Sequence, residues 1–70
     1  MAEGVYKFIE IAGSSTESWE KAAVAAVETA ARSLNDLRVA EVLEQDMTIE
    51  KGKVSAYRIK LKVSFKYHTD

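Results

Sequence analysis

Two carboxylates near the middle of the chain have a spacing that suits a metal ion. Glu44 and Asp46 lie two residues apart in a segment with strand-forming character, so both side chains point to the same face of a strand. Calcium takes about six to eight hard oxygen ligands. The two carboxylates could supply part of that set, with backbone carbonyls or the acids of a second subunit supplying the rest. Glu10 and Glu50 are weaker candidates, and no EF-hand loop is present.

A row of basic residues gives these acids an alternative role. Arg58, Lys60, Lys62 and Lys66 alternate with apolar residues and therefore share one face of a strand. Such a row could contact the phosphates of a nucleotide-like ligand or of RNA. More commonly it forms a solvated face that protects a sheet against edge pairing. Cross-strand pairing between this row and the two acids would equally explain their presence.

No catalytic arrangement is recognisable. His68 is the only histidine, lies near the C-terminus and has no cysteine or serine partner arrangement. Ser14 and Ser15 are best explained as turn and cap residues, and Trp19 as a core or subunit-contact residue. The chain has no proline, so the N-terminal proline base of tautomerase-like enzymes is missing. The sequence therefore does not predict an enzyme.

Length and composition predict one small domain, residues 1–70, that buries apolar surface against other subunits. Of the 70 residues 47% are hydrophobic, and there is no cysteine to form a disulfide. Domains of this size are marginally stable alone and often rely on oligomerisation. The net charge of −1 indicates neither nucleic acid nor an anionic membrane as partner. No signal peptide or membrane span is recognisable, so the expected location is the cytoplasm.

The pattern of apolar residues predicts an α+β fold with the order β-α-β-β. The predicted elements are a strand at 5–12, a helix at 16–34, a strand at 38–49 and a strand at 54–67. Gly13 is expected to break the first strand, Ser15 to cap the helix and Asn35 to adopt a left-handed conformation after it. Gly52 is the expected positive-φ residue of a hairpin that makes the last two strands antiparallel neighbours. The sheet is therefore predicted to be three-stranded, antiparallel and packed on one helix.

One face of the helix and one face of the last strand are predicted to form the core. The helix face consists of Trp19, Ala22, Ala23, Ala26, Val27, Ala30, Ala31 and Leu34. The strand face consists of Tyr57, Ile59, Leu61, Val63, Phe65 and Tyr67. The many alanines of the helix allow another element to approach closely.

The chain resembles the dodecin family over nearly its whole length. The resemblance rests on the order and spacing of VYK (5–7), GSS (13–15), the Ala-rich helix, AEV (40–42) and YRIKLKVSF (57–65). It implies a subunit that assembles into a hollow homododecamer. Typical members of the family bind paired flavins between subunits.

Two positions depart from the flavin-binding pattern of that family. The resemblance places the tryptophan that stacks on the isoalloxazine ring at Val39, and the glutamine that hydrogen-bonds the ring at Arg58. Val39 offers no aromatic face, and an arginine side chain donates but cannot accept. Both anchors of the flavin are therefore replaced.

Three segments resemble instead the calcium-binding dodecins, namely SWE (18–20), DLRVA (36–40) and EQDM (44–47). The resemblance implies a non-enzymatic assembly that binds and stores a small ligand, with calcium favoured over FMN or riboflavin. The alternatives are a flavin-binding dodecin and a structural or protein-interaction module that has no small ligand.

Overall fold

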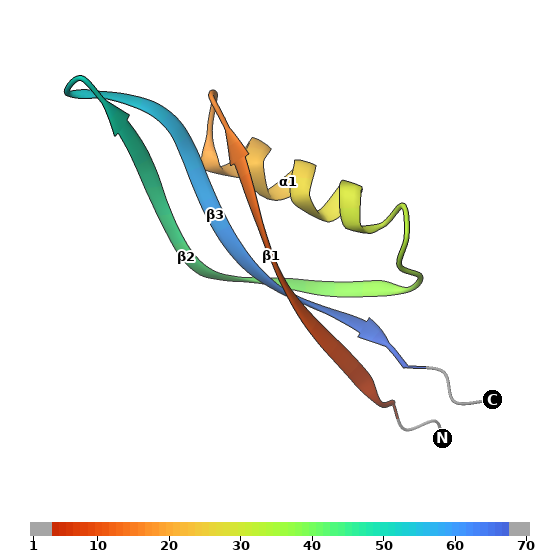
Figure 1. Ribbon diagram of the computed structural model, residues 1–70. Helices are drawn as coiled ribbons and strands as arrows, with labels where there is room; N and C mark the ends of the chain where they lie inside the picture. The colour runs from red at the N-terminus through yellow and green to blue at the C-terminus, as the bar shows by residue number, and fades with distance from the viewer. Residues whose placement is uncertain (1–3, 68–70) are drawn as a thin grey trace.

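The predicted order of elements is confirmed by a computed structural model, which describes residues 4–67. Strand β1 (Tyr6–Ser15) is followed by helix α1 (Trp19–Ala30) and by the long strands β2 (Leu37–Glu50) and β3 (Lys53–Lys66). Figure 1 shows a twisted sheet with α1 lying across one face. The fold is thus the predicted α+β arrangement of one helix on a three-stranded sheet.

The last strand lies in the centre of the sheet. The strand order is β1-β3-β2, and β3 pairs antiparallel with both neighbours. A central strand buried on one side reads as a regular alternation of apolar and polar residues, which is the pattern of residues 57–67. The three-stranded antiparallel sheet is therefore confirmed.

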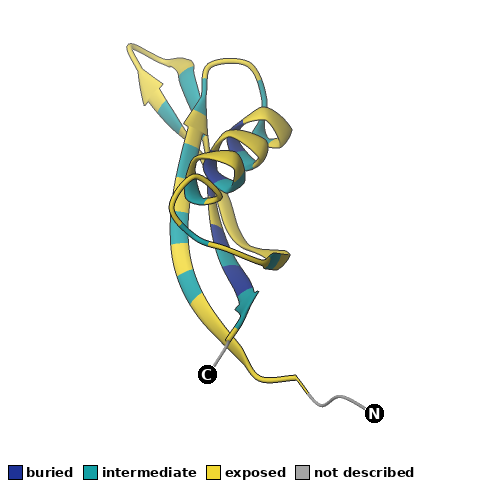
Figure 2. Ribbon diagram, turned by 90° about the vertical axis from the view of Figure 1, so that its right-hand side faces the viewer, coloured by how far each residue is buried: buried dark blue, intermediate teal, exposed yellow. Residues whose placement is uncertain are grey.

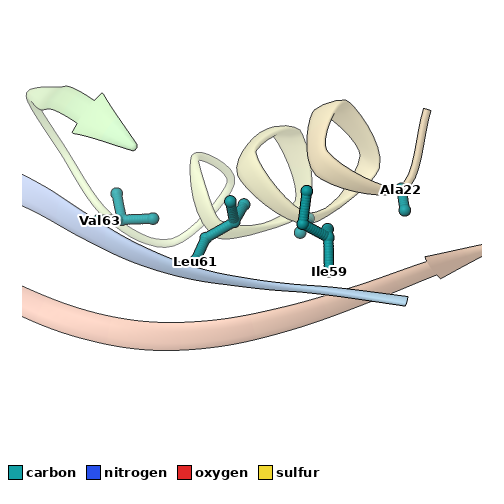
Figure 3. Packing of buried hydrophobic residues seen from close by; sticks show 5 residues of the cluster. Ala22, Ile59, Leu61 and Val63 are labelled. Atoms are coloured by element: carbon teal, nitrogen blue, oxygen red, sulfur yellow. The ribbon is translucent and has the colours of Figure 1, made fainter. Parts of the chain in front are cut away.

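The core lies between α1 and the helix-facing side of β3. Ile59, Leu61 and Val63 are at most 4% exposed and pack against Ala22 and Ala26 of the helix (Figure 3). The predicted core faces are confirmed at these positions. Partly buried residues extend this core: Ile9, Ile11, Trp19, Ala23, Val27 and Leu37.

Gly13 does not end the first strand, contrary to the expectation. Strand β1 continues to Ser15, and Gly13 pairs with Ile59 of β3. A Cβ atom at Gly13 would lie 2.4 Å from the carbonyl oxygen of Ala22 and 2.9 Å from the Cβ of Ala26. The glycine is therefore required by the close approach of the helix, and three small side chains set the distance between the two layers.

The helix starts later than predicted because Ser18, not Ser15, is its N-cap. Ser18 has an extended backbone, and its hydroxyl accepts a hydrogen bond from the backbone N–H of Lys21 at 3.0 Å. Ser15 has a different role: its Oγ accepts from the backbone N–H of Glu17 at 2.9 Å. It thereby closes the turn between β1 and α1.

The helix also ends earlier than predicted, at Ala30, with Ala31 as its C-cap. The amides of Arg32 and Ser33 bond to carbonyls three residues back, which is the tighter pattern common in a last turn. The left-handed residue is Asp36, with φ of 61°, and not Asn35. The chain thus leaves the helix through a longer connection than expected.

The hairpin between β2 and β3 turns at Lys51 and Gly52. Gly52 has the predicted positive φ, 76°, and Lys51 has a positive φ of 52° as well. Two consecutive positive φ values are typical of the two-residue turns whose twist matches that of the flanking strands.

Helix α1 packs on β1 and β3, while β2 extends beyond it (Figures 1 and 2). On β2 the side chains of Val42, Met47 and Ile49 are 50%, 43% and 66% exposed. The chain measures 54 × 20 × 14 Å along its principal axes. One subunit therefore leaves a substantial part of its apolar surface in water, as the composition predicted.

Replacing Gly13 by alanine tests the close contact between helix and sheet. Because the added methyl group meets the backbone of Ala22, we expect the Gly13→Ala variant to lose about 1–3 kcal/mol of stability, as overpacked cores do. Chemical denaturation measures the loss. Gly4→Ala is the matched control, since the nearest atoms to its methyl group belong to the end of the exposed Tyr6 side chain, at 3.1 Å, and not to the backbone. Equal stability of both variants would contradict the assigned role of Gly13.

Candidate functional site

The polar face of the sheet lies opposite α1 and carries the residues that could bind a ligand. Arg58, Lys60 and Lys62 of β3 stand on this face, because they alternate with the buried Ile59, Leu61 and Val63. On the neighbouring strand β1, Glu10 pairs with Lys62 and Ser14 with Arg58. We name this side of the sheet the outer face; within residues 4–67 no helix covers it.

A β-bulge in β2 brings a third carboxylate of this strand to the outer face. Val42 pairs with Leu61 and Glu44 with Lys60, which leaves Leu43 as the extra residue. The bulge reverses the alternation of the strand. Glu41, opposite Lys62, therefore faces the same way as Glu44 and Asp46. Simple alternation would have placed Glu41 on the other face, which is why the sequence did not indicate it.

Three of the four predicted metal candidates, Glu10, Glu44 and Asp46, line one hollow of about 620 Å³ on the outer face. We call it the charged hollow; its lining includes Glu10, Ser14, Glu44, Asp46, Arg58 and Lys60. Carboxylates from both edge strands and cations from the central strand thus meet in one place. Glu50 is not among the lining residues, since it pairs with Lys53 beside the hairpin turn.

Asp46 and Arg58 form a bidentate ion pair in this hollow. The guanidinium donates from Nε to Oδ1 at 2.7 Å and from Nη2 to Oδ2 at 2.8 Å. These hydrogen bonds lower the pKa of the Asp46 carboxyl and raise the pKa of Arg58. The two side chains are about half exposed, so solvent screens the pair. The cross-strand pairing that the sequence left open as an alternative is confirmed for Asp46.

Glu44 and Glu10 are less firmly held. Lys60 lies opposite Glu44 in the register, yet its ammonium is 3.9 Å from Glu10 Oε1. Within residues 4–67 no ion pair involves Glu44. In that part of the chain, no group of three Asp, Glu or His side chains lies close enough to hold a metal ion. The hollow of one subunit therefore offers carboxylates but not a complete set of ligands.

A second hollow of about 380 Å³ lies further along the outer face. Val39 lines it together with the aromatic rings of Tyr6 and Phe8, which are 46% and 58% exposed. The ammonium of Lys62 stands over the Phe8 ring, 4.9 Å from its centroid. These two rings were not predicted to have a functional role, although two aromatic residues that flank Lys7 in a strand share one face. We call this the aromatic hollow.

The two positions that the family resemblance assigned to flavin binding, Val39 and Arg58, lie in different hollows. Val39 pairs with Ser64 and lines the aromatic hollow, whereas Arg58 lines the charged hollow. Arg58 and Ser64 are six residue steps apart, which span about 20 Å of strand. Within one subunit these positions therefore do not contribute to one site.

Trp19, the first residue of α1, contacts both strands of the β2–β3 hairpin. Its ring meets Tyr57 edge-on with centroids 5.1 Å apart. Its indole N–H donates to the backbone carbonyl oxygen of Asp46 at 3.0 Å. Trp19 was expected in the core or at a subunit contact; it is partly buried and packs against the core, with an added polar contact to the strand that carries Glu44 and Asp46. His68 lies outside the described residues. In the described part of the chain, no helix is long and apolar enough to cross a membrane.

The bidentate pair makes the ionisation of Asp46 depend on Arg58. Since the pKa of Asp46 is lowered in the folded chain, the pair stabilises the fold above the unfolded-state pKa of about 3.9. This contribution is lost as the pH falls through the folded-state pKa. We expect Arg58→Gln to raise the pKa of Asp46, measured from its carboxyl carbon by NMR titration. Lys62→Gln is the control and should leave that pKa unchanged; equal shifts in both variants would contradict the assignment.

Comparison with known proteins places the chain in a family. The Dodecin family model matches residues 5–68. Calcium dodecin from Mycobacterium tuberculosis is 55% identical over 62 residues, which cover 89% of this chain and 87% of the relative. A crystal structure of that calcium dodecin, described as calcium-chelating with a novel calcium-binding site, has 54% identity and a TM-score of 0.81, covering 94% of each chain.

Other solved structures share the fold at lower identity. A variant of Thermus thermophilus dodecin is 35% identical with a TM-score of 0.90, over 97% of this chain and 100% of that chain. Dodecin from Streptomyces coelicolor is 28% identical with a TM-score of 0.92, and each chain is covered completely. With the family model matching nearly the whole length and a relative above half identity, this chain belongs to the dodecin family.

Proposed function

We propose that this chain is a single-domain subunit of a hollow homododecamer that binds and stores calcium and does not catalyse a reaction. The observation that carries the proposal is that Glu10, Glu44 and Asp46 line one hollow on the outer face. Carboxylate oxygens are the ligands that calcium prefers. A relative with 55% identity bears the name calcium dodecin, which supports the same ion.

We propose that another subunit or water completes the coordination shell. Calcium needs about six to eight oxygens, and the carboxylates of one charged hollow supply only part of them. The backbone carbonyl of Asp46 is already a hydrogen-bond acceptor for Trp19. The exposed apolar side chains of β2 support the presence of neighbouring subunits, because association is the usual way to cover such a surface.

Flavin is a second candidate ligand, and the aromatic hollow favours it. Tyr6 and Phe8 present exposed rings beside Val39, so an aromatic face is available although Val39 itself has none. A planar ligand would have to move Lys62 from the Phe8 ring before it could stack there. We place calcium first because Glu44 in the charged hollow has no ion-pair partner within residues 4–67. Calcium can therefore reach this carboxylate without moving another side chain.

Calcium titration of the purified protein tests the proposal. Removing one ligand charge should weaken binding about tenfold or more, so we expect Glu44→Gln to raise the calorimetric Kd for calcium by that factor. Glu28→Gln, on the exposed surface of α1, removes the same charge outside the hollow and should leave the Kd unchanged. Native mass spectrometry of both variants should show the dodecamer.

Three results would contradict the proposal. Calcium binding that is equally weakened by both substitutions would place the ion outside the charged hollow. Quenching of added FMN or riboflavin fluorescence, without any calcium binding, would favour the flavin alternative. Thermal stability that neither calcium nor flavin raises would favour an interaction module, since a ligand that binds only the folded state must stabilise it.

A further inference from the structure

Asp46 already holds a cation, the guanidinium of its own chain. Each carboxylate oxygen accepts one hydrogen bond from Arg58, at 2.7 and 2.8 Å. This fork geometry is the strongest way in which an arginine binds a carboxylate. An ion that coordinates Asp46 through both oxygens therefore has to take them from Arg58.

The backbone of Asp46 is held from the opposite side. Trp19 donates its indole N–H to the carbonyl oxygen of Asp46 at 3.0 Å, and its ring is supported by Tyr57. Residue 46 is also paired with Arg58 across the sheet. The carboxylate is thus fixed at its base, so the mobile partner of the ion pair is the long side chain of Arg58.

Glu44 lies two residues before Asp46 on the same face of β2, but in the described part of the chain its carboxylate is not held by an arginine. No ion pair within residues 4–67 involves Glu44, and the ammonium of Lys60 is nearer to Glu10. An arriving ion therefore finds one carboxylate open and the next one occupied.

We propose that Arg58 is the resident counterion of the charged hollow and that a divalent cation binds there by displacing it from Asp46. The inference rests on the proposed calcium binding. Binding is then an exchange in which the hollow gives up a single positive charge and takes a double one. Two cations cannot share one small carboxylate without repulsion, so Arg58 lowers the affinity for calcium and raises the concentration at which the hollow fills.

The test compares two variants that each remove one positive charge from β3. Both side chains of the pair are about half exposed, so the surroundings are nearly as polar as water. A unit charge about 6 Å from a divalent ion then changes the affinity for that ion about tenfold, so we expect Arg58→Gln to lower the calorimetric Kd for calcium about tenfold. Lys62→Gln removes the same charge from the same face, but its side chain lines the aromatic hollow. Residue 62 lies four steps, about 13 Å, along the strand from residue 58. The effect of Lys62→Gln on the Kd for calcium should therefore stay below about threefold, because solvent and salt screen exposed charges over such a distance.

Each outcome decides between the two proposals. Calcium bound by all three proteins with the same Kd, or bound more weakly by Arg58→Gln, would overturn the exchange and leave calcium binding intact. No calcium bound by any of them would overturn the proposed function and the exchange together. An equal gain in both variants would reduce the effect of Arg58 to general charge and would also overturn the exchange.

A measurement on the unmodified chain keeps the inference testable if a variant fails to fold. Calcium should shift the NMR signal of the Arg58 Nε–H group, because that donor loses Oδ1 of Asp46. Trp19 is the only tryptophan, so its fluorescence should change in the same titration through its bond to residue 46. Calcium binding by calorimetry with both signals unchanged would overturn the exchange.

Discussion

The short distance between helix and sheet at Gly13 is the constraint on which the rest of the subunit depends. The helix can lie against β1 and β3 only because Gly13, Ala22 and Ala26 have almost no side chain there. With the helix in that place, Ile59, Leu61 and Val63 are buried and the alternate residues of β3 must face outward. The basic row and both hollows of the outer face follow from this arrangement.

Most of the fold could be predicted because it is encoded by local periodicity. The alternation around Leu61 identified the central strand and its buried side, and Gly52 identified the hairpin. The errors arose where tertiary contacts override a local preference. Gly13 reads as a strand breaker until the helix that needs its missing side chain is present, and Ser15 reads as a cap until Ser18 is seen to be in the better position.

The candidate site was predictable only in part, for reasons of geometry. Two residues of spacing were enough to place Glu44 and Asp46 on one face, and they do share it. Glu41 joins them only through the bulge at Leu43, which no alternation pattern reveals. Which acid pairs with which base depends on the register between β2 and β3. Sequence alone therefore left open which residue of the basic row pairs with which acid, and the structure selects Arg58 for Asp46.

The uncovered stretch of β2 has a thermodynamic consequence. A chain that keeps Val42, Met47 and Ile49 largely in water can complete its apolar burial only against another molecule. Part of the free energy that keeps the chain folded is then a free energy of association, and it scales with the logarithm of protein concentration. Dilution acts on such a chain as a mild denaturant. Its melting temperature is a property of the solution as much as of the sequence.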